Sequence, residues 1–201
     1  MRRLIFALGI CFIVILAAGA CYAAWMLHRG FSTRTAPGAI EASLATSMRN
    51  AAFPSHYKSM RNPVTATPDV FREGMEHWAD HCSPCHANNG NGDTMYGKTM
   101  YPRPPDMRRK ETQDMSDGEL YYTIQNGIML SGMPAFGTPE DNDLDSWKLV
   151  VFIRHLPSLS QTEESEMEKM NPKSPEDMKE EQNEENFLQG SPAPAPSPHH
   201  H

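Results

Sequence analysis

Two cysteines and a histidine are the residues of this chain with the clearest chemistry. They lie in the run Cys82-Ser83-Pro84-Cys85-His86. Two thiols three positions apart, followed at once by histidine, are typical of the attachment site of a c-type haem. The thiols would add to the porphyrin vinyl groups, and His86 would supply one axial ligand to the iron. One tight turn suits this chemistry because it presents both sulfurs to the same porphyrin edge.

Two other interpretations of the cysteine pair are a redox-active Cys-x-x-Cys and half of a zinc site. Zinc would need further ligands, and His77 and His81, four residues apart, could share a helix face beside the cysteines. The other two cysteines, Cys11 and Cys21, lie in an apolar N-terminal stretch. Neither interpretation explains the histidine that directly follows Cys85, so the motif favours haem attachment.

From this motif outward the chain resembles the cytochrome c family. Gly74 and Trp78 precede Cys82 at the spacing of that family's first helix, where a small residue lets the final helix cross closely. A Gly-Met-Pro sequence around Met133 follows a short predicted helix. The resemblance, which covers about residues 66–160, implies that Met133 is the second axial ligand of the haem iron. Met129 is the nearest competitor.

The resemblance also implies which residues surround the haem. A proline carbonyl orients the ligating histidine in the family, and Pro105 fits that position best, with Pro104 as the runner-up. Buried propionates need hydrogen-bond donors or cations. Candidates by position are Arg103, Tyr101, Lys98 and the indole of Trp147.

The elements that position these residues are predicted to be helices. The first begins at Thr67-Pro68-Asp69, which combines an N-cap residue with a proline in the first turn. The capping box Ser116-Asp117-Gly118-Glu119 begins a second. The last runs from about Asp143 to Leu156 and, by resemblance, crosses the first at Leu149 and Phe152. We therefore expect an all-α cytochrome c-type haem domain of three or more helices.

An uncharged apolar run from Leu4 to Leu27 follows Arg2 and Arg3. It is long enough to cross a bilayer as a helix, and the arginines favour a cytoplasmic N-terminus. The alternatives are a cleaved signal peptide and a lipoprotein processed at Cys21. All three place the haem domain outside the cytoplasm. We expect a single-pass protein of the bacterial cytoplasmic membrane with its haem domain on the periplasmic side.

The chain divides into five predicted segments. These are a membrane anchor (1–28), a spacer with a weak amphipathic helix (29–65), the haem domain (66–160), an acidic helical extension without a strong apolar face (161–190) and a disordered Pro/Ala-rich tail (191–201). The spacer helix has Ile40, Leu44 and Met48 at four-residue steps. The tail ends in three histidines that could bind a divalent metal or could be a purification tag, namely His199, His200 and His201.

The charge distribution bears on the class of partner. Residues 1–65 carry a net charge of +6, residues 66–160 carry −6 and residues 161–201 carry −7, and no basic stripe is present to bind nucleic acid. We expect an electron carrier, not an enzyme, with redox proteins as donor and acceptor. The alternatives are a haem-bearing subunit of a larger oxidase or dehydrogenase and an open-site haem peroxidase or gas sensor.

Overall fold

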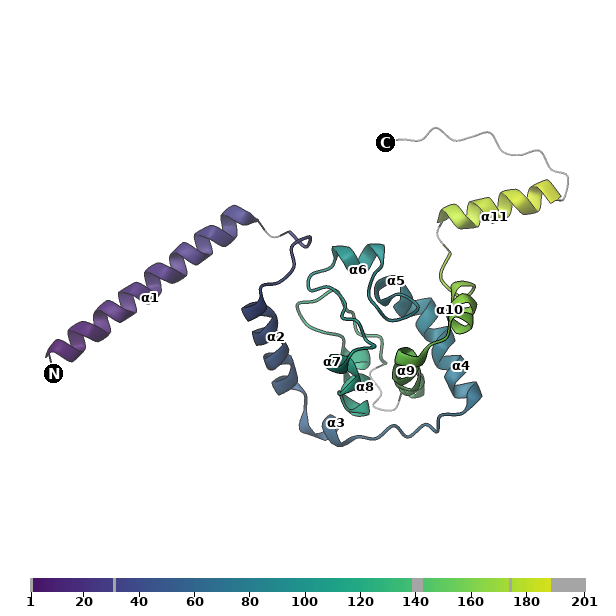
Figure 1. Cartoon of the computed structure of the whole chain (residues 1–201), viewed down its shortest axis with the longest axis horizontal. Coiled ribbons are helices and arrows are strands. Elements are labelled where there is room, and N and C mark those ends of the chain that lie inside the picture. The colour runs from purple at the N-terminus through teal and green to yellow at the C-terminus, as the bar shows by residue number, and fades with distance from the viewer. Residues whose placement is uncertain (1, 31, 139–142, 174, 189–201) are drawn as a thin grey trace.

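The chain folds into helices joined by loops (Figure 1). The structure is a computed structural model that describes residues 2–30, 32–138, 143–173 and 175–188. Every regular element in these ranges is helical, which confirms the expected all-α class. The elements are α1 (Arg2–Arg29), α2 (Ala39–Ala52), α3 (Ser55–Ser59), α4 (Pro68–His77), the π-helical turn η1 (Trp78–Cys82), α5 (Ser83–His86), α6 (Met95–Thr99), α7 (Lys110–Gln113), α8 (Asp117–Asn126), α9 (Leu144–His155), the 3-10 turn η2 (Leu156–Ser158), α10 (Gln161–Glu168) and α11 (Pro175–Leu188).

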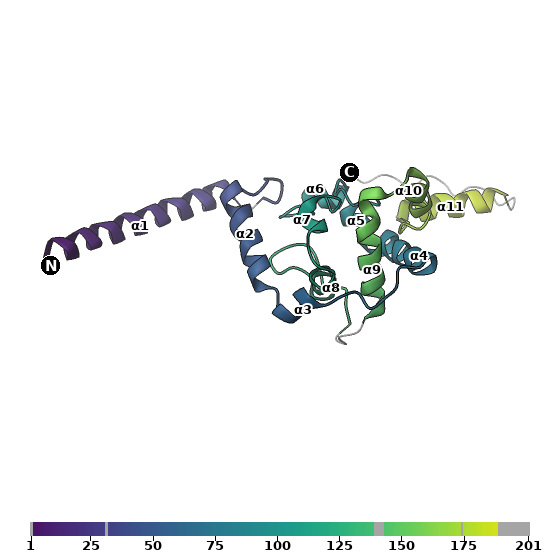
Figure 2. The same cartoon turned by 60° about the horizontal axis from the view of Figure 1, so that its bottom comes forward.

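Helix α1 extends away from the other helices in both ribbon views (Figures 1 and 2). It has 28 residues, and none of them is buried. At about 1.5 Å per residue the helix is about 42 Å long, which exceeds the roughly 30 Å hydrocarbon thickness of a bilayer. The helix is therefore long and apolar enough to span a membrane.

Helices α4 and α9 cross at Gly74, as the resemblance implied. A Cβ atom on Gly74 would lie 2.5 Å from the backbone oxygen of Lys148 and 3.2 Å from Cβ of Phe152. The Trp78 ring lies beside that of Phe152, with centroids 5.6 Å apart. Only a residue without a side chain permits this close an approach between the two helices.

Replacing Gly74 by alanine should lower the free energy of unfolding by about 1–3 kcal/mol, because a methyl group here would force α4 and α9 apart. This loss outweighs the gain in helix propensity, which is at most about 1 kcal/mol. Urea denaturation monitored by circular dichroism measures the change. Gly38→Ala is a matched control, since a Cβ there meets no atom within 4 Å. Equal midpoints for the two variants would contradict the close crossing.

Helix α8 packs against both α3 and α9. The predicted capping box is present at its start: Oγ of Ser116 accepts a hydrogen bond from the Glu119 amide at 3.2 Å, and the Glu119 carboxylate accepts one from the Ser116 amide at 2.8 Å. The ring of Tyr121 stacks on that of Trp147 with centroids 4.1 Å apart. Trp147 is consequently part of the core, with 1% of its surface exposed.

The spacer contributes to the fold through its second half. Helix α2 has no buried residue, and Ile40 on its apolar stripe is 86% exposed. Phe53, directly after α2, is buried and packs edge-on against Tyr122 of α8. The Asn62 side chain donates a hydrogen bond to the backbone oxygen of Trp147 at 2.9 Å. Residues 53–64 therefore bind to the helical core, whereas the stripe on α2 faces away from it.

Helix α10 belongs to the same core, although it lies beyond the predicted end of the haem domain. The Met167 side chain is fully buried and belongs to the same core cluster as side chains of α4, α8 and α9. A carboxylate oxygen of Glu163 lies 3.1 Å from Nε2 of His155 on α9. The sequence analysis predicted that this segment lacks a strong apolar face and did not anticipate the docking of α10. A single buried methionine is enough to hold so short a helix against the core. The segment boundaries themselves stay predictions.

Candidate functional site

The cysteine motif lies where the first helix of the core ends. Helix α4 continues into the π-helical turn η1, which ends at Cys82, and α5 then contains Cys85 and His86. A π-helical turn inserts an extra residue into the helical path and is frequent at functional sites. Both cysteines are half-buried and have free thiols. The structure thus places the two thiols and the histidine within one compact turn.

Hydrogen bonds from three sides hold this turn. The indole Nε1 of Trp78 donates to the backbone oxygen of Ala87 at 3.1 Å. The Gly92 amide donates to the backbone oxygen of His86 at 2.8 Å. The Thr94 hydroxyl donates to the backbone oxygen of Cys85 at 3.3 Å. The motif is therefore fixed by the helix before it and by the loop after it.

The environment of the motif favours neutral forms of its side chains. Burial raises the pKa of the Cys82 thiol to about 12, and the nearby Cys85 adds to this effect. Burial lowers the pKa of His86 to about 4, so that its imidazole is neutral at pH 7. Neutral imidazole is the form that binds iron, whereas redox Cys pairs and zinc sites use thiolates.

The imidazole of His86 also has unused hydrogen-bonding capacity. Its Nδ1 atom is buried and, within the described ranges, has no hydrogen-bond partner. Leaving such an atom unpaired costs about 1–3 kcal/mol, so this nitrogen is available to an acceptor that fixes the ring plane. A neutral imidazole beside two un-ionised thiols fits a covalently attached haem.

The loop that contains Met133 is closed by its own backbone. The Ile128 amide donates to the backbone oxygen of Met133 at 3.1 Å, and the Ser131 hydroxyl accepts a hydrogen bond from the Met133 amide at 3.1 Å. The ring of Phe136, farther along this loop, meets that of His81 edge-on with centroids 6.5 Å apart. The structure therefore brings the Gly-Met-Pro loop against the turn that carries the cysteines.

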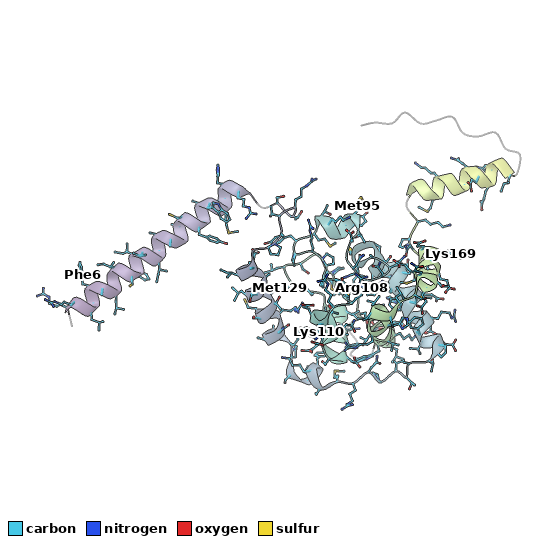
Figure 3. The ribbon with its side chains drawn as sticks, viewed as in Figure 1. Phe6, Met95, Arg108, Lys110, Met129 and Lys169 are labelled. Carbon is cyan, nitrogen blue, oxygen red and sulfur yellow. The ribbon has the colours of Figure 1, made fainter. Side chains whose placement is uncertain are left out.

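The methionines differ in their surroundings. Met133 is half-buried, whereas Met129 is 88% exposed. Figure 3 labels Met129 in the loop after α8 and Met95, which is 73% exposed, on α6. The sulfur of Met100 would lie 3.1 Å from a Cβ on Gly132, so it packs directly against the Met133 loop. Sequence reasoning missed Met100 because no local pattern marks it.

The proline-rich loop lies beside the exit from the motif. The Met107 amide donates to the backbone oxygen of Gly90 at 2.8 Å, and the backbone oxygen of Pro104 would lie 2.8 Å from a Cβ on Gly92. Because Nδ1 of His86 has no partner among the described residues, no hydrogen bond joins it to Pro105 in this structure. The role of Pro105 as the orienting carbonyl stays a prediction.

The three principal candidates for the propionates lie in different surroundings. Arg103 is exposed, and Trp147 is in the core against Tyr121. The Tyr101 hydroxyl donates to the carboxylate of Glu41 on α2, a contact that raises the pKa of the tyrosine. The structure does not bring these side chains together, and their roles at the haem stay predictions.

Two features of the site were not anticipated. Ala87, directly after His86, has a φ of 63°, a conformation that residues other than glycine rarely adopt. The Ser83 hydroxyl lies 3.2 Å from the side-chain amide of Asn171, just after α10. The positive φ of Ala87 follows from the sharp change of chain direction after His86. The contact between Ser83 and Asn171 joins residues 88 positions apart, which no local sequence signal could indicate.

The predicted metal site at His199, His200 and His201 lies outside the described residues. Within the ranges that the structure describes, no group of three or more His, Cys, Asp or Glu side chains could hold a metal ion. The metal-binding role of the terminal histidines stays a prediction.

Fold and site together define a class of protein: a small all-α domain with a Cys-x-x-Cys-His turn is a c-type cytochrome domain. Residues 69–153 match the family model described as cytochrome c oxidase, cbb3-type, subunit III, so this part of the chain is a cytochrome c-type domain. The domain accordingly binds haem c covalently, with its iron. A comparison with curated proteins found no match.

Proposed function

We propose that this protein is a membrane-tethered one-electron carrier with a single haem c. The family match supports electron transfer by haem, and the sequence contains one Cys-x-x-Cys-His motif. Helix α1 supports the tether, since it is apolar, long and free of buried residues. Helices α2 and α3 follow α1 in the sequence and lie between it and α4, the first helix of the haem domain.

In this proposal Cys82 and Cys85 would hold the haem through thioether bonds, and His86 and Met133 would ligate its iron. The observation that carries the proposal is the ring contact between Phe136, three residues after Met133, and His81, directly before Cys82. Haem iron supplies a reversible change between two oxidation states. The two ligands leave no position for substrate, and a thioether ligand favours the reduced state, which raises the potential.

The proposed location is the bacterial cytoplasmic membrane with the haem domain on the periplasmic side. Arg2 and Arg3 at the start of α1 favour a cytoplasmic N-terminus by the positive-inside rule. A helix that crosses once then carries all later residues to the opposite side. Membership of the cytochrome c family supports the same side, because such domains are usually extracytoplasmic.

Potentiometric titration of the purified full-length protein tests the proposal. We expect a single one-electron transition, with a slope of about 59 mV per tenfold change in the ratio of oxidised to reduced protein. We also expect the oxidised protein to bind cyanide slowly and weakly, since Met133 must leave first. Fast, tight cyanide binding would reveal an open position and favour the peroxidase or gas-sensor alternative.

A second candidate function is that of a haem-bearing subunit in a larger oxidase or dehydrogenase. The observation that favours it is the family description, which names a subunit of a cytochrome c oxidase. In that case the redox partner would be held permanently, and the acidic residues after α10 would be the contact surface. Mild-detergent extraction distinguishes the two functions, because a subunit would elute with its complex and a free carrier would elute alone.

A further inference from the structure

A pair of histidines lies next to the haem attachment turn, and neither is assigned to hold the haem or its iron. His77 is the last residue of α4, and His81 lies in the π-helical turn that follows. Their rings are neighbours, with centroids 4.7 Å apart and planes tilted by 32°. Half of the His81 side-chain surface is exposed, and His77 is half-buried, so solvent ions can reach the pair.

The separation of the rings matches that of two imidazoles on one metal ion. A metal–nitrogen bond of about 2.0–2.1 Å places each ring centroid about 3.2 Å from the metal. Bond angles of about 90–109° at the metal then require centroids about 4.5–5.2 Å apart. The observed centroid separation of 4.7 Å lies within this range.

Charges around the pair favour a cation. Oδ2 of Asp80 lies 3.2 Å from Nδ1 of His81, which favours a proton on Nδ1 and leaves Nε2 free to bind a metal. Asp143 and Asp145, at the start of α9, act electrostatically on His77. Burial, together with the neighbouring His81, lowers the pKa of His77, so this ring is neutral at pH 7.

We propose that His77 and His81 together bind one divalent transition-metal ion, and that Cu²⁺ binds most tightly. Imidazole nitrogens suit Cu²⁺, Ni²⁺ and Zn²⁺, and Cu²⁺ is the strongest of these in the Irving–Williams order. Two protein ligands leave the remaining coordination positions to water or to a donor from another molecule. The site is separate from the haem iron and does not depend on the proposed electron-transfer function.

Calorimetric titration of the full-length haem protein with Cu²⁺ tests this proposal. All variants carry glutamine at positions 199–201, so that the terminal histidines do not compete. We expect one Cu²⁺ per chain, with nitrogen hyperfine structure from two imidazoles in the electron paramagnetic resonance spectrum. His77→Gln and His81→Gln should each weaken binding at least tenfold. Asp80→Asn should weaken it by about tenfold or more, as loss of a ligand-orienting carboxylate does elsewhere.

His56→Gln is the matched control, because His56 is an exposed helical histidine whose ring lies beside that of Tyr57, with centroids 4.2 Å apart. This variant should bind Cu²⁺ like the parent protein. Unchanged haem absorption and circular dichroism would show that the other variants are folded. The proposal would be overturned if both His77→Gln and His81→Gln bound Cu²⁺ with the affinity of the parent protein. The two histidines would then be neighbouring rings without a ligand.

Discussion

Replacing Met133 by alanine should lower the reduction potential of the haem by roughly 0.1–0.3 V, because axial ligation is the strongest control that a protein has over this potential. The thioether of methionine stabilises ferrous iron, and water or a nitrogen ligand in its place does so less. The haem should stay covalently attached, since the change does not touch Cys82 or Cys85. Potentiometry and absorption spectra of the purified variant measure both effects.

Two other methionines provide matched controls for this prediction. Met129 lies four residues earlier in the same loop and is 88% exposed, so Met129→Ala should leave the potential unchanged. Met100 packs against Gly132 and supports the loop from outside, so Met100→Ala should shift the potential far less than Met133→Ala. An unchanged potential and spectrum in Met133→Ala would refute Met133 as the axial ligand. A large shift in Met100→Ala alone would assign the ligand to Met100.

A chain that ends at Ser160 should lose about 3–5 kcal/mol of its free energy of unfolding. This truncation removes Met167 from the core, and an emptied site of this size costs about 2–5 kcal/mol. It also removes the Glu163 contact to His155 and the Asn171 contact to Ser83. Urea denaturation of the haem protein, followed by circular dichroism, measures the loss.

The control for this truncation is a chain that ends at Lys173, which keeps α10 and Asn171 and lacks only α11 and the residues after it. We expect this chain to unfold within about 0.5 kcal/mol of the full-length protein, as changes outside the core usually do. Equal stability of both truncated chains would contradict the burial of α10. The chain that ends at Lys173 also tests whether the acidic residues after α10 hold a complex, because it leaves the helical core intact.

Helix α10 shows why the extent of the folded core could not be predicted from the local sequence. Its sequence, Gln161–Glu168, is strongly acidic and carries a single large apolar residue, Met167. Composition therefore predicts a solvated extension. The helix docks because Met167 joins a core cluster that also contains side chains of α4, α8 and α9, and that cluster exists only after those helices have packed. The same reasoning applies to Trp147, whose position in the core depends on stacking with Tyr121.

Features that depend on interactions between residues close in the chain could be predicted from the sequence alone. The helix starts at Thr67 and Ser116 could be predicted because a capping side chain bonds to amides two or three residues ahead. The haem cofactor was predicted from the Cys-x-x-Cys-His motif, and the α4–α9 crossing at Gly74 from the resemblance to the cytochrome c family. The ligand assignments of Cys82, Cys85, His86 and Met133 rest on the same motif and resemblance and stay proposals.

The contacts between segments far apart in the sequence could be identified only from the tertiary structure. It placed Phe136 against His81, Asn171 beside Ser83, and the Tyr101 hydroxyl on Glu41. Such contacts depend on how whole helices pack, and no spacing within a segment encodes them. The neighbouring rings of His77 and His81 depend both on local sequence spacing and on three-dimensional geometry. Their four-residue spacing is visible in the sequence, whereas the distance that suits a metal ion follows from the geometry of the π-helical turn.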